Sequence, residues 1–195
     1  MDTNLKQLAT SNSPAKDERS GSVQTLVADC QAGNRDALRR MFEQFSPKIY
    51  RLTVRMADEQ EAPDLTQQVF LQVFTKIDQF AGKSQFETWL YRIAINTVLQ
   101  HRRKASRQRL VPLVNDPIGD RPQNPDRIDY QELLDQALHQ VDADLRIIFV
   151  LREVEELPYR AIASVLDISE GTVASRLNRA RRELKDRLEV LGWQP

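Results

Sequence analysis

A segment that begins at Phe86 combines aromatic, amide and basic side chains at helical spacing. Trp89, Arg92 and Asn96 fall on one side of a helix. Three basic residues follow, Arg102, Arg103 and Lys104. Aromatic rings stack on unpaired bases, at about 1–3 kcal/mol per base, and arginines make salt-sensitive contacts with phosphates. These residues, here called the strand face, predict a surface for partly single-stranded nucleic acid. By residue type alone Trp89 and Tyr91 would rather be core aromatics, and only the basic residues that follow favour the functional interpretation.

The stretch from Tyr159 to Asn178 has the pattern of a helix-turn-helix. Ile162, Ala163 and Leu166 predict a short helix, and residues 167–169 a turn before a longer helix. The longer helix and its N-cap carry hydroxyl and guanidinium groups on one side, here called the reading face: Ser169, Thr172, Ser175, Arg176, Arg179 and Arg181. Such groups bond base edges and phosphates in a major groove. A plain helical hairpin is the alternative.

A third helix is predicted from Pro63 to Ile77, because proline suits the first helical position. Its core stripe consists of Leu65, Val69, Val73 and Ile77, flanked by Phe70 and Phe74. A second side carries Asp64, Gln67, Gln68 and Leu71, here called the docking face. A leucine among polar residues on an exposed side is typical of a protein-docking patch. An ordinary solvated side with one stray leucine remains an equal alternative.

The charge distribution favours nucleic-acid binding even though the net charge is zero, with 28 basic and 28 acidic residues. Residues 101–109 contain five Lys or Arg and no acid. Residues 176–187 contain six Lys or Arg and two acids, Glu183 and Asp186. Acidic residues gather instead at 58–64 and 116–135. Local basic surfaces can bind phosphates while the whole chain stays neutral. The alternative is that both runs are solvated helix faces.

Helical periodicity without sustained period-two alternation predicts an all-α fold. We expect separate helices before and after Pro47, and a capping box in which Ser84 caps a helix and Glu87 bonds back. Phe86 should then face inward with Leu90, Ile93 and Thr97. On the longer helix of the helix-turn-helix, the residues that should face inward are Val173, Leu177, Ala180, Leu184 and Leu188.

Composition divides the chain into two helical domains and two connecting or terminal segments. Residues 1–20 lack periodicity and are expected to be disordered, and residues 109–128 carry four of the nine prolines, which predicts a flexible acidic linker. The domains are expected at 21–108 and 129–192. The single cysteine, Cys30, excludes an internal disulfide and suits a reducing cytoplasm. No apolar run is long enough to span a bilayer.

Three strings in this order and spacing resemble the extracytoplasmic-function (ECF) sigma factors of bacterial RNA polymerase: Asp64–Phe70, Phe86–Asn96 and Gly171–Arg181. The resemblance covers about Val23 to Leu191. It implies two domains, sigma regions 2 and 4. The docking face would bind the clamp of core RNA polymerase, and the chain as a whole would contact the clamp and flap of the large subunits. The segment from Phe86 to Lys104 would melt and read the minus-ten promoter element, and the reading face would read the minus-thirty-five element.

The sequence departs from the family at two positions of the expected polymerase interface. Gln68 and Pro63 stand where the family often has acids. The resemblance also implies an anti-sigma factor as a partner. Neither a glycine-rich phosphate loop nor a cysteine–histidine metal motif is present, so we expect no cofactor, no metal and no enzymatic activity.

Two other function classes remain open from the residues alone. A stand-alone helix-turn-helix regulator would bind duplex DNA without polymerase, and would leave the docking and strand faces unexplained. An adaptor would bind polymerase or another protein without melting DNA, and would tolerate loss of Trp89 and Arg92.

Overall fold

The computed structural model describes residues 15–57, 59–108 and 130–193. These residues form eight α-helices, one 3-10 helix and one π-helical turn, and the described ranges contain no strand. This confirms the expected all-α fold class. The linker expected at 109–128 lies outside the described residues, as does the expected tail up to residue 14.

The N-terminal half consists of α1 (Ala15–Gln31), α2 (Arg35–Met56), α3 (Ala62–Lys76), the 3-10 helix η1 (Ile77–Gln79) and α4 (Phe86–Gln108). The helix α1 includes residues 15–20, so it begins earlier than the sequence suggested. Alanine, lysine, glutamate and arginine, which make up most of residues 15–20, are good helix formers even where apolar periodicity is missing. The side chain of Asn34 caps α2 by accepting bonds from the amides of Asp36 (2.9 Å) and Ala37 (3.2 Å).

Pro47 does not start a helix, as the sequence had suggested, but lies inside α2. Proline removes one amide donor and normally breaks or kinks a helix. Here the buried stripe of α2 continues across it, with Met41 and Phe45 before the proline and Ile49 and Leu52 after it. Burial of these side chains on both sides keeps the helix continuous.

The core stripe predicted for α3 is confirmed, because Leu65, Val69 and Val73 are each at most 1% exposed. Between α2 and α3 the hydroxyls of Thr53 and Thr66 lie 3.1 Å apart, and each also bonds the carbonyl of Ala62. These bonds satisfy polar groups that would otherwise be buried at a cost.

The capping box predicted at the start of α4 is wrong. The helix begins at Phe86, and the hydroxyl of Ser84 donates to the carbonyl of Gln85 at 3.3 Å. The carboxylate of Glu87 instead accepts a bond from Lys48 Nζ at 3.2 Å. The capping-box prediction fails because Glu87 has a charged partner, Lys48, on another helix. A pattern of neighbouring residues cannot reveal such a partner.

The C-terminal half consists of α5 (Tyr130–Gln140), α6 (Ala143–Phe149), the π-helical turn η2 (Val150–Val154), α7 (Tyr159–Leu166) and α8 (Glu170–Val190). The predicted turn between α7 and α8 is present. Asp167 ends α7 in the left-handed conformation (φ 56°). Ser169 then caps α8, its Oγ accepting from the amide of Thr172 at 3.1 Å. Of the inward residues predicted for α8, Val173, Leu177, Ala180 and Leu184 are buried, and Leu188, near the end of the helix, is half-buried.

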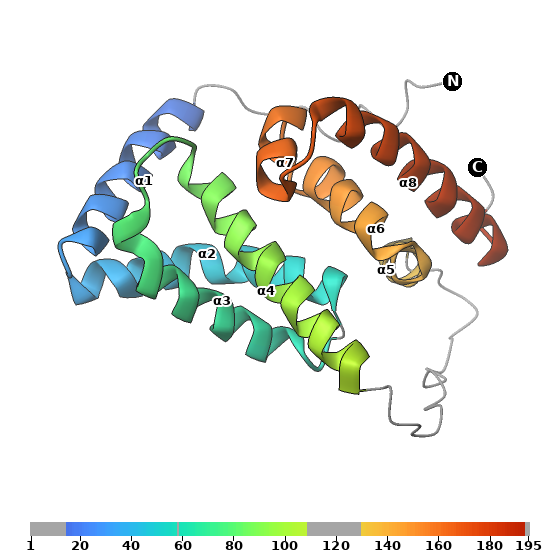
Figure 1. The fold of residues 1–195 in the computed structure, drawn as a ribbon, viewed down its shortest axis with the longest axis horizontal. Helices are drawn as coiled ribbons and strands as arrows, with labels where there is room; N and C mark the ends of the chain where they lie inside the picture. Colours follow the sequence, from blue (N-terminus) through green and yellow to red (C-terminus); the bar gives the residue numbers. More distant parts are fainter. Residues whose placement is uncertain (1–14, 58, 109–129, 194–195) are drawn as a thin grey trace.

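The two halves pack directly on each other. Helix α7 lies along α4, and the end of α2 meets α5 and α6 (Figure 1). One cluster of buried apolar residues runs through both halves and joins Ile95 on α4 to Ile162 on α7. Within the described residues, none of the helices is long and apolar enough to cross a bilayer.

Candidate functional site

The docking face lies on the solvent side of α3. Its residues Asp64, Gln67, Gln68 and Leu71 are all exposed, while the opposite side of α3 enters the core. Leu71 is 67% exposed, which is high for a large apolar side chain. Exposure of the four residues on one side of a regular helix gives a partner a polar patch with one exposed apolar side chain at its end.

The strand face lies on α4, and its basic members point into solvent. Arg92 and Asn96 are exposed, as are Arg102, Arg103 and Lys104 near the end of the helix. Trp89 is only half-buried, and its ring lies 5.4 Å from that of Phe80 and 5.7 Å from that of Phe86, centroid to centroid. The face therefore combines a rigidly held ring with solvated cations.

Phe86 does not belong to this surface. It is 5% exposed, and its ring packs edge-on against Phe45 (5.3 Å) and Phe80 (5.6 Å). The inward position expected from helical spacing is therefore what the structure shows, together with Leu90, Ile93 and Thr97. The Phe86 ring packs against the Trp89 ring and is buried, so it is not exposed for contact with DNA.

The reading face lies on the first turns of α8, where Ser175 and Arg179 are exposed and Thr172 and Arg176 are half-buried. The hydroxyls have internal partners. Those of Ser169 and Thr172 lie 2.8 Å apart, and Ser175 Oγ donates to the Thr172 carbonyl at 3.0 Å. The guanidinium groups of Arg176 and Arg179 therefore offer the face its most extended donors.

Arg181 differs from the other arginines of the reading face. Its Nη2 and Nε donate to Glu153 Oε1 at 2.6 and 3.2 Å. Glu153 belongs to η2, so the ion pair ties α8 to the π-helical turn within the C-terminal half. The guanidinium of Arg181 is therefore already paired with a carboxylate of the same protein.

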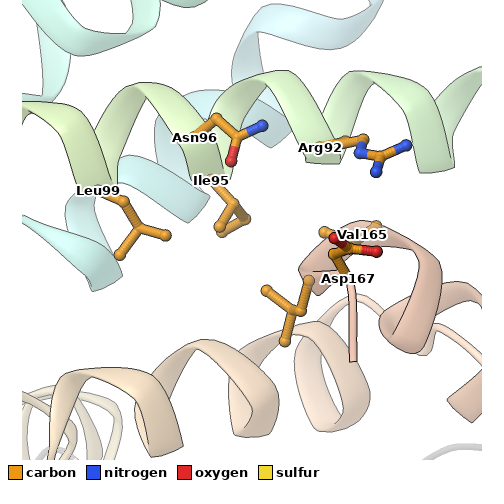
Figure 2. Close-up of a pocket in the computed structure, with 7 residues that line it drawn as sticks. Arg92, Ile95, Asn96, Leu99, Val165 and Asp167 are labelled. Atoms are coloured by element: carbon orange, nitrogen blue, oxygen red, sulfur yellow. The ribbon is translucent and has the colours of Figure 1, made fainter. Parts of the chain in front are cut away.

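A cleft of about 230 Å³ separates α4 from α7, and Figure 2 shows Arg92 and Asn96 of the strand face on its α4 side. The α4 side also has Ile95 and Leu99, and the α7 side has Val165, Leu166 and Asp167. The volume lies below the roughly 300–1,000 Å³ typical of small-molecule sites. We therefore regard the cleft as the incompletely filled margin of a helix–helix contact.

Between the two halves, three residues from distant parts of the chain also meet. The hydroxyl of Tyr91, on α4, donates a hydrogen bond to a carboxylate oxygen of Glu155, which follows η2. Lys48 Nζ on α2 lies 3.8 Å from the same carboxylate and 5.4 Å from the centre of the Tyr91 ring. Tyr91 is 1% exposed, and the side chain of Glu155 4%.

Burial and the charge of Glu155 perturb the pKa of Tyr91. Loss of water around the phenol, and then the nearby Glu155 carboxylate, raise the pKa of Tyr91 well above its ordinary value. Tyr91 therefore stays protonated, which keeps it a hydrogen-bond donor. Sequence reasoning missed this group, because Tyr91 looked like an ordinary core aromatic and nothing near Glu155 marks it as buried.

A second set of bonds joins the end of α2 to α5 and α6. Arg55 Nε lies 3.6 Å from a carboxylate oxygen of Asp135, and His139 Nε2 lies 3.2 Å from the carbonyl of Ala57. The buried Arg146 donates to the carbonyls of His139 at 2.7 Å and Arg55 at 3.4 Å. The two halves are therefore held at two separate places.

The remaining candidate groups are structural. Cys30 is 3% exposed, and burial raises the pKa of its thiol, which makes the thiol unreactive. His101 Nε2 lies 3.7 Å from a carboxylate oxygen of Glu61. Within the described ranges, no group of three or more His, Cys, Asp or Glu residues could hold a metal ion.

Two family models match the chain. The model for sigma-70 region 2 matches residues 41–108, and the model for sigma-70 region 4 matches residues 131–184. The docking and strand faces lie in the first range, and the reading face lies in the second.

Among sequence relatives, the ECF RNA polymerase sigma-E factor of Haemophilus influenzae is 32% identical over 181 residues, which cover 86% of this chain and 96% of the relative. The sigma-E factor of Escherichia coli K12 is 33% identical over 181 residues, covering 86% and 95%. Both relatives therefore align over nearly their whole length.

Two solved structures share the fold. The sigma factor RpoE in complex with the anti-sigma factor NepR, from Bartonella quintana, has a TM-score of 0.66 at 24% identity, covering 78% of this chain and 96% of that chain. CnrH in complex with the cytosolic domain of CnrY has a TM-score of 0.64 at 22% identity, covering 85% and 96%.

Proposed function

The chain belongs to the ECF sigma factors, which bind core RNA polymerase and direct promoter-specific transcription initiation, and we propose how its three faces divide these tasks. The docking face binds core polymerase, the strand face opens and reads the minus-ten element, and the reading face reads the minus-thirty-five element. The observation that supports this division is their simultaneous exposure on α3, α4 and α8.

For the docking face, the physical argument is an apolar group surrounded by neutral amides. Burying Leu71 against the clamp removes apolar surface from water, and Gln67 and Gln68 can form rim hydrogen bonds. Gln68 lacks the charge that the family often has there, so this interface depends less on ion pairing. It should accordingly be less sensitive to salt than the DNA contacts.

For the strand face, the argument is the pairing of Trp89 with Arg92 and Asn96. A half-buried ring held by Phe80 can stack on a base without a large loss of side-chain entropy. The cations near the end of α4, Arg102, Arg103 and Lys104, can follow the phosphates beyond that base.

For the reading face, Arg176 and Arg179 on the first turns of α8 can reach guanine edges and phosphates. Thr172 and Ser175 lie beside them and can share their hydroxyls with bases. This is the docking geometry of a recognition helix, which contacts base edges with its N-terminal residues. Arg181 lies further along α8 and contributes at most a phosphate contact.

We propose domain limits of 21–108 for region 2 and 129–192 for region 4, connected by 109–128. Because the chain acts with RNA polymerase, we place it in the cytoplasm. Its task needs binding and no covalent chemistry, so we propose that it is not an enzyme. The Bartonella complex supports an anti-sigma factor as a further partner.

The decisive experiment is in-vitro transcription of fragmented source-genome DNA by core polymerase, with and without this chain. We expect discrete new RNA start sites that share two spaced motifs. Absence of new starts, together with duplex binding by the chain alone, would instead support a stand-alone helix-turn-helix regulator.

A further inference from the structure

We propose that Gln31, the last residue of α1, is a positioning residue for the strand face. Its amide group fixes the segment that carries Phe80, and Phe80 in turn fixes the Trp89 ring. The consequence for promoter opening rests on the proposed function of the strand face. The positioning itself concerns contacts within the free protein and can be measured without DNA.

The first support is a pair of hydrogen bonds between distant parts of the chain. Gln31 Nε2 donates to the carbonyls of Ile77 and Phe80, each at 2.9 Å. The amide nitrogen carries two hydrogens, so each carbonyl can receive one. Carbonyls at the end of a helix have no partner within it, and Gln31 supplies donors to those that follow α3. Helix α1 therefore holds the turn between α3 and α4, beside which it lies (Figure 1).

The second support is the group of rings that this turn carries. The Phe80 ring lies 5.4 Å from the Trp89 ring and 5.6 Å from the Phe86 ring, centroid to centroid. Phe86 is held by the core, where it is 5% exposed, whereas Phe80 is half-buried. The place of the Phe80 ring therefore depends on the turn, and the Trp89 ring loses one of its two supports if the turn moves.

The third support is the exposed loop that follows Phe80. Residues 81–85 are all exposed, and Gly82 adopts the left-handed conformation at φ 69°. Glycine has the widest backbone freedom of any residue, so a loop built around it is ordered mainly by what holds its ends. Phe86 holds the far end through the core. The bonds from Gln31 hold the near end, one residue before the loop begins.

Three substitutions at position 31 separate hydrogen-bond donation from the other properties of the side chain. Gln31→Met keeps the length without a donor, and Gln31→Glu replaces the donor by a carboxylate that the two carbonyls repel. Gln31→Lys keeps a donor, and a cation suits carbonyls at a helix end. Gln24→Glu, also exposed on α1, is the control for added charge. Because Gln31 is exposed, these changes leave the buried core intact.

The first measurement is the fluorescence of Trp89 in the full chain. The chain has two tryptophans, so Trp193→Phe as background leaves Trp89 as the only one. We expect Gln31→Met and Gln31→Glu to shift the emission to longer wavelength and to speed quenching by acrylamide. Gln31→Lys and Gln24→Glu should match the background protein. Unchanged emission and quenching in the first two variants would overturn the proposal, as would an equal change in Gln31→Lys.

The second measurement is promoter opening by core polymerase with each variant, on a promoter mapped by transcription. We expect Gln31→Met to slow opening about tenfold, the effect of losing two hydrogen bonds of ordinary strength. Binding of the closed complex should not change, because Gln31 touches no DNA in this arrangement. Gln31→Glu removes the same donor in a different way, so it provides the same test if Gln31→Met fails to fold.

A double-mutant cycle shows whether Gln31 acts through Trp89. If it does, Gln31→Met should slow opening no further in a chain that already carries Trp89→Ala. Additive losses, or normal opening by Gln31→Met while Trp89→Ala opens poorly, would overturn the proposal. Failure of the proposed function would look different. Trp89→Ala alone would then open promoters normally, while Gln31→Met would still change the fluorescence.

Discussion

The phenolic hydroxyl of Tyr91 donates a hydrogen bond to the carboxylate of Glu155, a residue 64 positions further along the chain. Tyr91 belongs to the helix that carries the strand face, and Glu155 precedes the helix-turn-helix. The bond therefore joins the two halves of the molecule. Since both side chains are buried, the coupling is protected from competition by water and salt.

Alkaline pH should lower the free energy of unfolding through Tyr91. Its pKa is raised by burial and Glu155, so the folded state keeps a proton that the unfolded state loses above about pH 10. The stability it contributes is complete below pH 10 and falls as pH rises, by up to about 1.4 kcal/mol per pH unit. Thermal unfolding from pH 8 to 11 measures this slope.

Tyr91→Phe should remove that slope. The other charges near the ring are Glu155 from the turn after η2, Glu87 on α4, and Lys48 and Arg51 on α2. They remain in the variant, so only the difference between the two proteins reports the phenol. Parallel pH profiles for both proteins would contradict the assignment.

Leu71→Glu should lower the affinity for core polymerase at least tenfold without unfolding the chain. Leu71 is 67% exposed, so a charge there costs the free protein little, while a buried interface would lose apolar area and gain an unpaired charge, more than about 1.4 kcal/mol. Val190→Glu is a matched control, since Val190 is 78% exposed on α8. Equal co-elution of both variants with polymerase would remove Leu71 from the interface.

Trp89→Ala should impair promoter opening more than closed-complex binding. Stacking of one base contributes about 1–3 kcal/mol, and this ring is the half-buried aromatic beside Arg92. Permanganate reactivity of promoter thymines measures opening, and duplex retention measures closed binding. The other tryptophan, Trp193, is substituted in the same way as a control. Wild-type reactivity in Trp89→Ala would contradict a stacking role.

Helix packing was predictable because its signal is local. The spacing of Leu65, Val69 and Val73 specifies which side of α3 is buried, and the structure confirms it. The Ser169 cap was predictable for the same reason, since donor and acceptor lie three positions apart. Such patterns need no knowledge of the partner helix.

The features that local patterns miss depend on tertiary contacts. Pro47 reads as a helix start, yet burial of Phe45 and Ile49 around it keeps α2 intact. The local pattern predicts Glu87 as half of a capping box, yet its carboxylate accepts a hydrogen bond from Lys48. The cleft between α4 and α7 also depends on a tertiary contact, because no spacing within α4 reveals that α7 lies opposite Arg92.

Arg176→Ala should weaken use of the upstream element by roughly 1–3 kcal/mol, the range for one good base-edge contact. Arg176 lies on the first turns of α8, one helical turn after Thr172, whose amide Ser169 caps. Transcription from promoters with mutated upstream bases measures discrimination. Lys185→Ala, which removes a surface pair with Glu189 (3.6 Å), is the control. Discrimination equal to wild type would place Arg176 outside the contact.

Arg181→Ala should weaken promoter binding less than Arg179→Ala. The guanidinium of Arg181 is held by Glu153 at 2.6 Å, so it must break this pair to reach a phosphate, while Arg179 is exposed on the reading face. Each phosphate contact that is lost should reduce the salt slope of log K by about 0.9. We expect this reduction for Arg179→Ala alone. A larger loss for Arg181→Ala would mean that DNA displaces Glu153, which Glu153→Gln should then make easier.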